Sequence, residues 1–227
     1  MKRFTIPLII ILLAATIAPA CAQPQPRRLL VIGDSLSQGL YATSEAHGYK
    51  FLVADGLGAQ LGWMKGTNLA VAETNWAAWD WDADVIVVEL GTNDLTGDIP
   101  EAEWPARYGA FLDALQATGA RIVVGNVPWS GRDEDGEGWR LARRFSGYIE
   151  AEAGARGIPV ADLWAVTLAT GEAGLSQPGE PSPFAPGFEG DGYHPSDEGH
   201  RVIAEEFLRV LEPRHRFWFP LFWRATK

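Results

Sequence analysis

The chain has 227 residues, of which 47% are hydrophobic and 21% are charged. This length and composition fit one globular domain with a sizeable core, and they exclude a disordered or fibrous chain. The formal net charge of −10 argues against a nucleic-acid partner and against docking onto an anionic membrane through charge alone. We attribute the acidity to solubility.

The first 22 residues have the pattern of a secretory signal peptide. Lys2 and Arg3 give a positive start, a short apolar segment runs from Ile6 to Ile17, and small residues follow. The apolar segment is too short to cross a bilayer. Cys21 lies in a poor bacterial lipobox, so lipidation there and plain cleavage before Gln23 are both open, and we favour cleavage. The protein is expected to be exported, either secreted or periplasmic, with a lipid anchor at Cys21 as the alternative.

One folded domain is expected over residues 27–213, after a polar spacer at residues 23–26. Short β-branched runs alternate with longer amphipathic segments, as in a parallel sheet covered by helices on both faces. The expected strands are Leu29–Ile32, Asn68–Val71, Val85–Leu90, Ile122–Val127 and Ile158–Asp162. The expected helices are Lys50–Leu61, Glu103–Thr118, Gly138–Ala155 and Ser196–Leu211. The stretch from Gly174 to Gly190 is rich in proline and glycine and should form a surface loop.

Signals at the helix ends support these boundaries. Gly119 and Gly157 lie just beyond two expected helices, where glycine commonly ends a helix. Ser196 can cap the last helix, and Asp197 and Glu198 complement its dipole.

Polar or aromatic residues follow the expected strands in order along the chain. Ser35 follows the first strand, Glu73 the second, Asn93 the third and Trp129 the fourth, and the loop after the fifth ends at His194. The carboxyl ends of parallel strands meet at one edge of a sheet, where open α/β folds bind ligands. These residues are therefore expected to assemble into one site.

The residue types at this edge suit nucleophilic catalysis. Ser35 needs a base to take its proton and a third group to orient that base, and His194 and Asp191, three residues apart, can supply both. Asn93 can donate to a developing oxyanion through its side chain, and backbone N–H groups of Ser35 and of the loop near Glu73 are further donors. The remaining histidines are interpreted as surface or packing residues: His47, His200 and His215.

The chain resembles the SGNH, or GDSL, hydrolase family. Gly33-Asp34-Ser35-Leu36 matches the nucleophile block, Gly91-Thr92-Asn93-Asp94 the asparagine block, and Asp191-Gly192-Tyr193-His194 the last block. The resemblance implies a flavodoxin-like three-layer α/β sandwich with a five-stranded parallel sheet, and an esterase mechanism without metal or cofactor. It assigns Ser35 as nucleophile, His194 as general base and then acid, and Asp191 as its orienting partner.

One block departs from the family pattern. Asn68 to Glu73 looks like the second block, and Glu73 then stands where that family usually has an oxyanion-hole glycine. A carboxylate facing the oxyanion would oppose catalysis through its like charge. The hypothesis at this point is that Glu73 points outward and that activity is reduced or redirected rather than lost.

Aromatic residues leave the substrate open. Trp76, Trp79 and Trp81 follow the second block, and these rings and Trp129 could stack on a sugar, line an acyl groove or simply pack. The aromatic tail at residues 214–227 could touch a membrane interface or pack over the domain.

We therefore expect an exported serine esterase that acts on small-acyl or lysophospholipid-type esters. A carbohydrate O-acetyl esterase and a non-catalytic binding module with the same fold are the alternatives.

Overall fold

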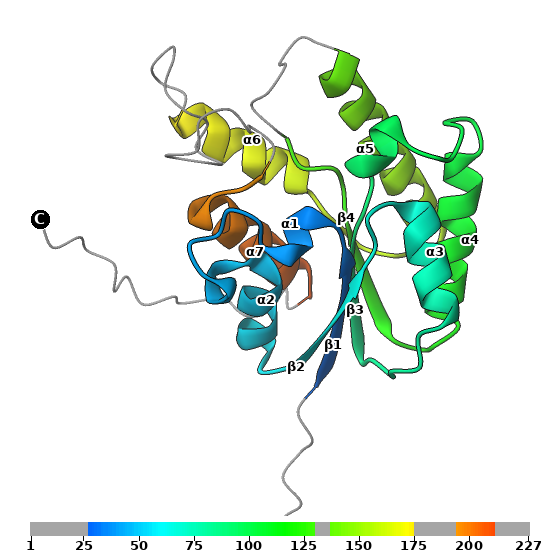
Figure 1. The fold of residues 1–227 in the computed structure, drawn as a ribbon, viewed down its shortest axis with the longest axis horizontal. Helices are drawn as coiled ribbons and strands as arrows, with labels where there is room; N and C mark the ends of the chain where they lie inside the picture. The colour runs from blue at the N-terminus through cyan, green and yellow to red at the C-terminus, as the bar shows by residue number, and fades with distance from the viewer. Residues whose placement is uncertain (1–26, 130–136, 175–193, 212–227) are drawn as a thin grey trace, which may run out of the picture.

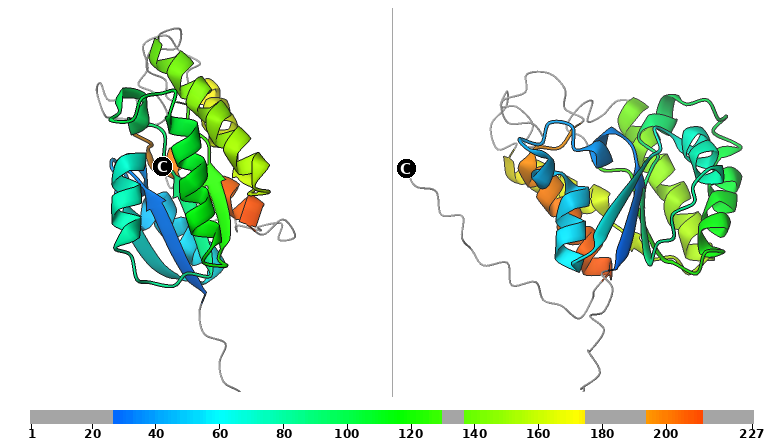
Figure 2. Two further views of the ribbon diagram at one scale, coloured as in Figure 1. Left: turned by 90° about the vertical axis from the view of Figure 1, so that its right-hand side faces the viewer. Right: turned by 60° about the horizontal axis from the view of Figure 1, so that its bottom comes forward.

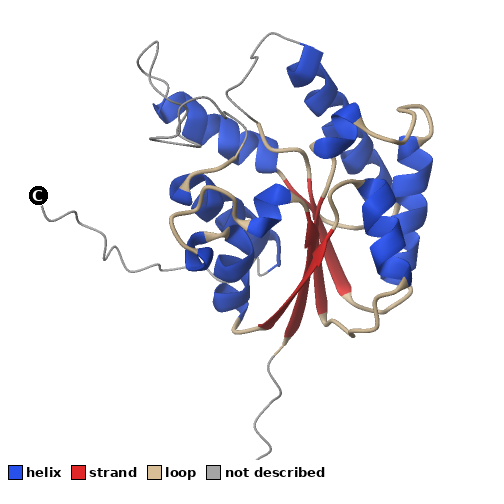
Figure 3. Ribbon diagram, in the orientation of Figure 1, coloured by secondary structure: helices blue, strands red, loops and turns tan. Residues whose placement is uncertain are grey.

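Five parallel strands form the centre of the molecule. The computed structural model describes residues 27–129, 137–174 and 194–211. The strands are β1 (Arg28–Gly33), β2 (Gln60–Lys65), β3 (Val85–Glu89), β4 (Arg121–Gly125) and β5 (Val160–Ala161). They form a single sheet in the order β2-β1-β3-β4-β5, shown in red in Figure 3. This is the strand order of flavodoxin-like folds, so the fold class expected from the sequence is confirmed.

Helices cover both faces of the sheet. They are α1 (Ser35–Gln38), α2 (Tyr49–Leu57), α3 (Leu69–Ala77), α4 (Trp104–Gln116), α5 (Glu137–Ala155), α6 (Leu163–Gly174) and α7 (Asp197–Leu211). Figure 1 shows α2, α6 and α7 on one side of the sheet and α3, α4 and α5 on the other. The rotated views in Figure 2 preserve this three-layer arrangement. None of the helices in the described ranges is long and apolar enough to cross a membrane.

The central strand β3 explains why both layers are needed. All five of its residues are buried. Ile86 and Val88 belong to the core shared with α4, whereas Val85 and Val87 belong to the core shared with α2 and α7. Side chains alternate between the two faces of a strand, so an unbroken apolar run requires helices on both sides.

The second strand was predicted at the wrong place. Residues 68–71 are not a strand, because the Asn68 side chain accepts a hydrogen bond from the Val71 N–H at 3.0 Å and so caps α3. The second strand is β2, and the expected Lys50–Leu61 helix ends earlier, at Leu57. β2 lies at the sheet edge with Met64 as its one buried residue, so it lacks the apolar run that marks the inner strands.

The signals predicted at the ends of α4, α5 and α7 are confirmed. Gly119 and Gly157 follow α4 and α5 with φ values of +79° and +66°, which glycine adopts without strain. The Ser196 hydroxyl accepts from the Gly199 N–H at 3.4 Å, and α7 has Asp197 and Glu198 in its first turn.

Candidate active site

Ser35 and Asn93 meet where the chain reverses its direction across the sheet. From β1 the chain moves outward to β2 and then crosses back to β3, so the connections after β1 and β3 diverge. Ser35 begins α1 directly after β1, and Asn93 begins the 3₁₀ helix η2 (Asn93–Thr96) after β3. Such a switch point is where doubly wound sheets bind ligands.

The turn that carries Ser35 is held by Asp34. The Asp34 side chain caps α1 by accepting from the Leu36 N–H at 2.8 Å. Gly39 ends this single turn with φ +85°. Ser35 is the first residue of the helix, so its N–H has no acceptor within the helix and remains a donor at the site.

A second set of hydrogen bonds supports the turn from below. The buried Ser37 hydroxyl donates to the Asp34 carbonyl at 2.7 Å and accepts from Trp63 Nε1 at 2.9 Å. Lys50 Nζ donates to the Ser37 and Gln38 carbonyls at 2.8 and 3.0 Å. The two bonds from Lys50 satisfy carbonyls that so short a helix leaves without partners.

His194 reaches Ser35 from the far end of the sequence. Its Nε2 lies 2.9 Å from Ser35 Oγ, although the two residues are 159 positions apart. This is the distance expected between a nucleophile and its base. The structure thus brings together two of the three residues of the predicted triad. Asp191, the third, lies outside the described residues.

Tyr41 packs against the histidine. Its ring centroid lies 5.1 Å from that of His194. Tyr41 has φ +65°, and it is the one non-glycine residue with positive φ among those described. Left-handed backbone costs an ordinary residue about 1–2 kcal/mol, and such strain clusters at functional sites.

The loop that carries Tyr41 is fixed to the start of α7. Asp197 accepts from the Thr43 N–H at 2.8 Å and from the Thr43 hydroxyl at 2.6 Å, and it pairs with His47 Nδ1 at 3.0 Å. His200 is fully buried under the loop, with Nε2 3.4 Å from the Leu40 carbonyl. His47 and His200 thus hold the loop, in line with their interpretation as surface and packing residues.

Asp34 also connects the nucleophile turn to Asn93. Asn93 Nδ2 donates to Asp34 Oδ2 at 3.0 Å, which fixes the amide beside Ser35. An amide nitrogen carries two hydrogens, so this bond does not exhaust its capacity to donate. Burial raises the pKa of Asp34 to about 6, and the hydrogen bond from Leu36 opposes that shift.

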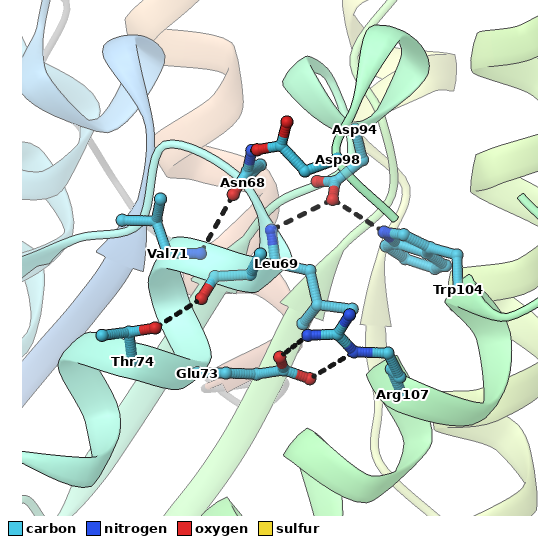
Figure 4. A network of polar contacts seen from close by, with 10 residues as sticks. Asn68, Leu69, Val71, Glu73, Thr74, Asp94, Asp98, Trp104 and Arg107 are labelled. Carbon is cyan, nitrogen blue, oxygen red and sulfur yellow. Dashed lines mark hydrogen bonds and ion pairs between the residues drawn. The ribbon is translucent and has the colours of Figure 1, made fainter. Parts of the chain in front are cut away.

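Glu73 does not lie where the sequence placed it. It is in the middle of α3, where its backbone N–H belongs to the helix, and its carboxylate forms an ion pair with Arg107 of α4. Figure 4 shows Glu73 and Arg107 pointing toward one another, apart from the contact between Asp94 and Trp104. The residue directly after β2 is Gly66, whose N–H donates to the Gly33 carbonyl at 2.9 Å. The loop from Gly66 to Asn68 therefore occupies the position expected for Glu73, because the preceding strand was predicted several residues too late.

The four tryptophans considered for substrate binding are accounted for elsewhere in the fold. Trp129 is 1% exposed and belongs to the core. Trp76, Trp79 and Trp81 line a pocket of about 240 Å³ before the start of β3, at the amino end of the strands. Packing thus explains Trp129, and the other three lie at the opposite edge of the sheet from Ser35.

Sequence reasoning missed Tyr41 and Glu89, and it used Asp34 only as part of a motif. Asp34 had a signal, because aspartate before a short helix is a common cap. Glu89 also had one, since it is the single charged residue in the buried run Val85–Leu90. Tyr41 had none, because its contact with His194 depends on tertiary packing.

Comparisons with known structures agree with this architecture. A lipolytic protein of the G-D-S-L family from Veillonella parvula is 19% identical, with a TM-score of 0.62 over 83% of this chain and 99% of its own. The acetylxylan esterase Axe2 from Geobacillus stearothermophilus is 20% identical, with a TM-score of 0.62 over 82% of this chain and 94% of its own. TesA is also 20% identical, with a TM-score of 0.62 over 82% of this chain and 99% of its own.

These identities show the shared fold, and the family model gives the relationship. No curated protein matches the chain. The model of the GDSL-like lipase/acylhydrolase family matches residues 31–202, which include the turn after β1, the turn after β3 and the start of α7. The chain therefore belongs to the GDSL-like lipase/acylhydrolase family.

Proposed function

We propose that this hydrolase is an exported serine esterase that cleaves carboxylic esters through an acyl-enzyme intermediate. The observation that carries the proposal is the 2.9 Å contact between Ser35 Oγ and His194 Nε2 at the switch point of the sheet. A serine hydroxyl is a weak nucleophile until a base removes its proton, and His194 is in place to do so.

The proposed steps follow from this contact. His194 Nε2 takes the Ser35 proton while Oγ bonds to the ester carbonyl carbon, and the carbonyl oxygen becomes an oxyanion. The Ser35 N–H and Asn93 Nδ2 are the donors for that oxyanion. His194 then gives its proton to the departing alkoxide, which leaves as an alcohol. Water repeats the sequence and releases the acid. Asp191 is proposed to orient His194 through Nδ1.

The test is hydrolysis of p-nitrophenyl acetate by the mature protein and by Ser35→Ala. We expect the substitution to abolish turnover, on the order of 10⁴-fold or more, because the nucleophile is lost. Ser44→Ala is the matched control, since Ser44 is exposed in the nearby loop and should leave the rate unchanged. Hydrolysis that survives in Ser35→Ala would refute the mechanism. A wild-type protein that cleaves no ester would favour the non-catalytic binding module.

For the substrate, we propose a small-acyl or lysophospholipid-type ester. The second candidate is a carbohydrate O-acetyl ester, and it is supported by the acetylxylan esterases among the similar structures. Rates on p-nitrophenyl butyrate, lysophosphatidylcholine and acetylated xylo-oligosaccharides separate the two. A specificity constant highest on the acetylated sugar would replace the first candidate by the second.

Export is proposed from the N-terminal 22 residues, with cleavage before Gln23. Intact-mass measurement of the protein from its native host tests this. A mass that begins at Gln23 supports cleavage, whereas a diacylglycerol adduct on Cys21 would show a lipid anchor.

A further inference from the structure

Glu89 is a buried carboxyl group for which the proposed mechanism has no use. It ends β3 and is 1% exposed. In the sheet it lies in register between Gly33 of β1 and Gly125 of β4. By strand alternation its side chain lies on the face of Val85 and Val87. Its neighbours in this row have no side chain, and the side chains of Ser37, Leu163 and Phe207 pack against these glycines on either side of Glu89.

The close approach of the turn depends on this row. A Cβ on Gly33 would lie 2.8 Å from Ser37 Cβ and 3.0 Å from the Glu89 carbonyl oxygen. Real side chains do not tolerate such contacts without a shift of the backbone. The glycine therefore lets the Ser35 turn sit against the end of β3, where Glu89 is.

Among the described residues, the charged groups that act most strongly on Glu89 are two carboxyl groups, Asp34 and Asp94. Neither of its carboxyl oxygens accepts a hydrogen bond from a donor in the described residues. A buried carboxylate without a partner costs several kcal/mol. Burial and the neighbouring Asp34 raise the pKa of Glu89 well above its ordinary value, which favours the neutral acid over the carboxylate.

Asp34, in contrast, makes bonds that an ionised carboxylate strengthens. One oxygen accepts from the Leu36 N–H and the other from Asn93 Nδ2. Hydrogen bonds to a charged acceptor are roughly twice as strong as neutral ones. The carboxyl groups of Asp34 and Glu89 are near enough for each to shift the pKa of the other. The Glu89 carboxyl opposes the increase in the pKa of Asp34 that burial causes.

We propose that Glu89 is a positioning residue, a neutral carboxylic acid that shares its proton with Asp34 and so keeps the nucleophile turn and Asn93 in place. It touches no reacting atom and acts through Asp34. Only the expected effect of Glu89 on kcat rests on the proposed esterase function. The protonation of Glu89 can be measured without any ester.

The groups that face this pair come from several elements. Asp94 of η2 raises the pKa of both carboxyl groups, and His194 lowers that of Asp34. Burial raises the pKa of the phenols of Tyr49 in α2 and Tyr108 in α4, and the charge of Glu89 would raise it further. Neither phenol therefore ionises near neutral pH. Of the two carboxyl groups of the pair, Asp34 is the one with a pKa near neutral pH, at about 6.

Two substitutions separate a donor role from simple packing. Glu89→Gln keeps the shape and an N–H donor, so Asp34 should stay ionised and kcat should remain within about threefold of wild type. Glu89→Leu removes the donor. We expect kcat at pH 7 to fall about 10- to 100-fold, somewhat less than the loss of an oxyanion donor, with KM little changed. The acid limb of the pH–kcat profile should move to higher pH.

Val87→Ala is the matched control, because Val87 is fully buried on the same face of β3. It should lower stability and leave the acid limb where it is. If Glu89 only fills space, Glu89→Leu should behave like Val87→Ala, and that result would overturn the proposal. Equal losses of kcat in Glu89→Gln and Glu89→Leu would do the same.

An infrared difference spectrum gives a readout that needs no catalysis. Wild type minus Glu89→Gln at pH 7 should show the carbonyl band of a protonated carboxylic acid. If the protein cleaves no ester but shows this band, the esterase proposal is refuted and the inference about Glu89 still holds. A carboxylate band instead would overturn the inference, whatever the activity.

Discussion

Replacement of His200 by glutamine should make the stability of the protein less sensitive to acid. His200 is fully buried, and burial lowers its pKa from 6.5 to about 4. Its Nδ1 lies 3.4 Å from the Tyr49 N–H and its Nε2 3.4 Å from the Leu40 carbonyl, which fits a neutral ring. The folded state therefore resists protonation at this residue, whereas the unfolded chain takes up a proton below pH 6.5.

The sign and size follow from linkage. A group whose pKa is lower in the folded state gives stability that is complete above its unfolded pKa and is lost as the pH falls toward the folded value. The difference between 6.5 and about 4 corresponds to about 3 kcal/mol in total. About 2 kcal/mol of this should be lost by pH 5.

The assay is urea unfolding followed by tryptophan fluorescence at pH 7, 6 and 5. The free energy of unfolding of wild type should fall toward or below that of His200→Gln as the pH decreases. The comparison between the two proteins is needed because Asp34 acts in the opposite direction. Its raised pKa makes the folded state take up a proton between about pH 6 and 3.8, which favours folding in acid.

His47→Gln is the control, because His47 is half exposed in the same loop and its loss should leave the acid sensitivity in place. A difference between wild type and His200→Gln that stays constant from pH 7 to pH 5 would refute the assignment of His200 as a buried neutral histidine.

Three further predictions test the geometry around Ser35. Glu73→Gly should cost about 1–2 kcal/mol, from glycine in a helix and the lost pair with Arg107, and leave kcat/KM on p-nitrophenyl acetate nearly unchanged. A rise of several orders of magnitude would restore Glu73 to the oxyanion hole. Gly33→Ala should destabilise the protein by about 1–3 kcal/mol and lower kcat, because the added Cβ forces the turn away from β3. Gly147→Ala in α5 is the control and should stabilise the protein slightly, because the space around its Cβ is open. The urea midpoint and the turnover of both variants test this. Asp94→Ala should cost about 3 kcal/mol in chemical denaturation, because the Leu69 N–H and Trp104 Nε1 lose a buried acceptor, and Asp94→Asn should recover much of it; equal losses would contradict this account.

The inner sheet was predictable because burial leaves a direct trace in the sequence. Val85 to Val88 can lie between two helical layers only as a strand, and the alternation of its side chains between two cores bears this out. The edge strand β2 was not predictable in the same way. It has one buried residue, and the apolar run at Leu69–Ala72 is a stronger strand signal than β2 itself. The cap by Asn68 decided the outcome, and the placement of Glu73 failed with it.

The prediction that one site contains Ser35, Asn93 and His194 did not require every strand to be placed correctly. Each follows or approaches the carboxyl end of an inner strand, so an error at the edge of the sheet did not move them. Contacts that depend on side-chain packing were beyond the sequence. The ring of Tyr41 on His194 and the register of Glu89 with Gly33 require the assembled sheet.

Asp34 physically couples the nucleophile block to the asparagine block. Its two oxygens hold the Leu36 N–H, which fixes the nucleophile turn, and Asn93 Nδ2, 59 residues away. One ionised carboxylate thus sets the distance between the nucleophile and an oxyanion donor. A catalytic group displaced by 1 Å can lose on the order of 10² in rate, so the charge state of this buried carboxyl matters as much as its presence. Because burial raises the pKa of Asp34 to about 6, a small further rise would protonate it at neutral pH. A neighbouring group that donates a hydrogen bond to the Asp34 carboxylate therefore supports the site.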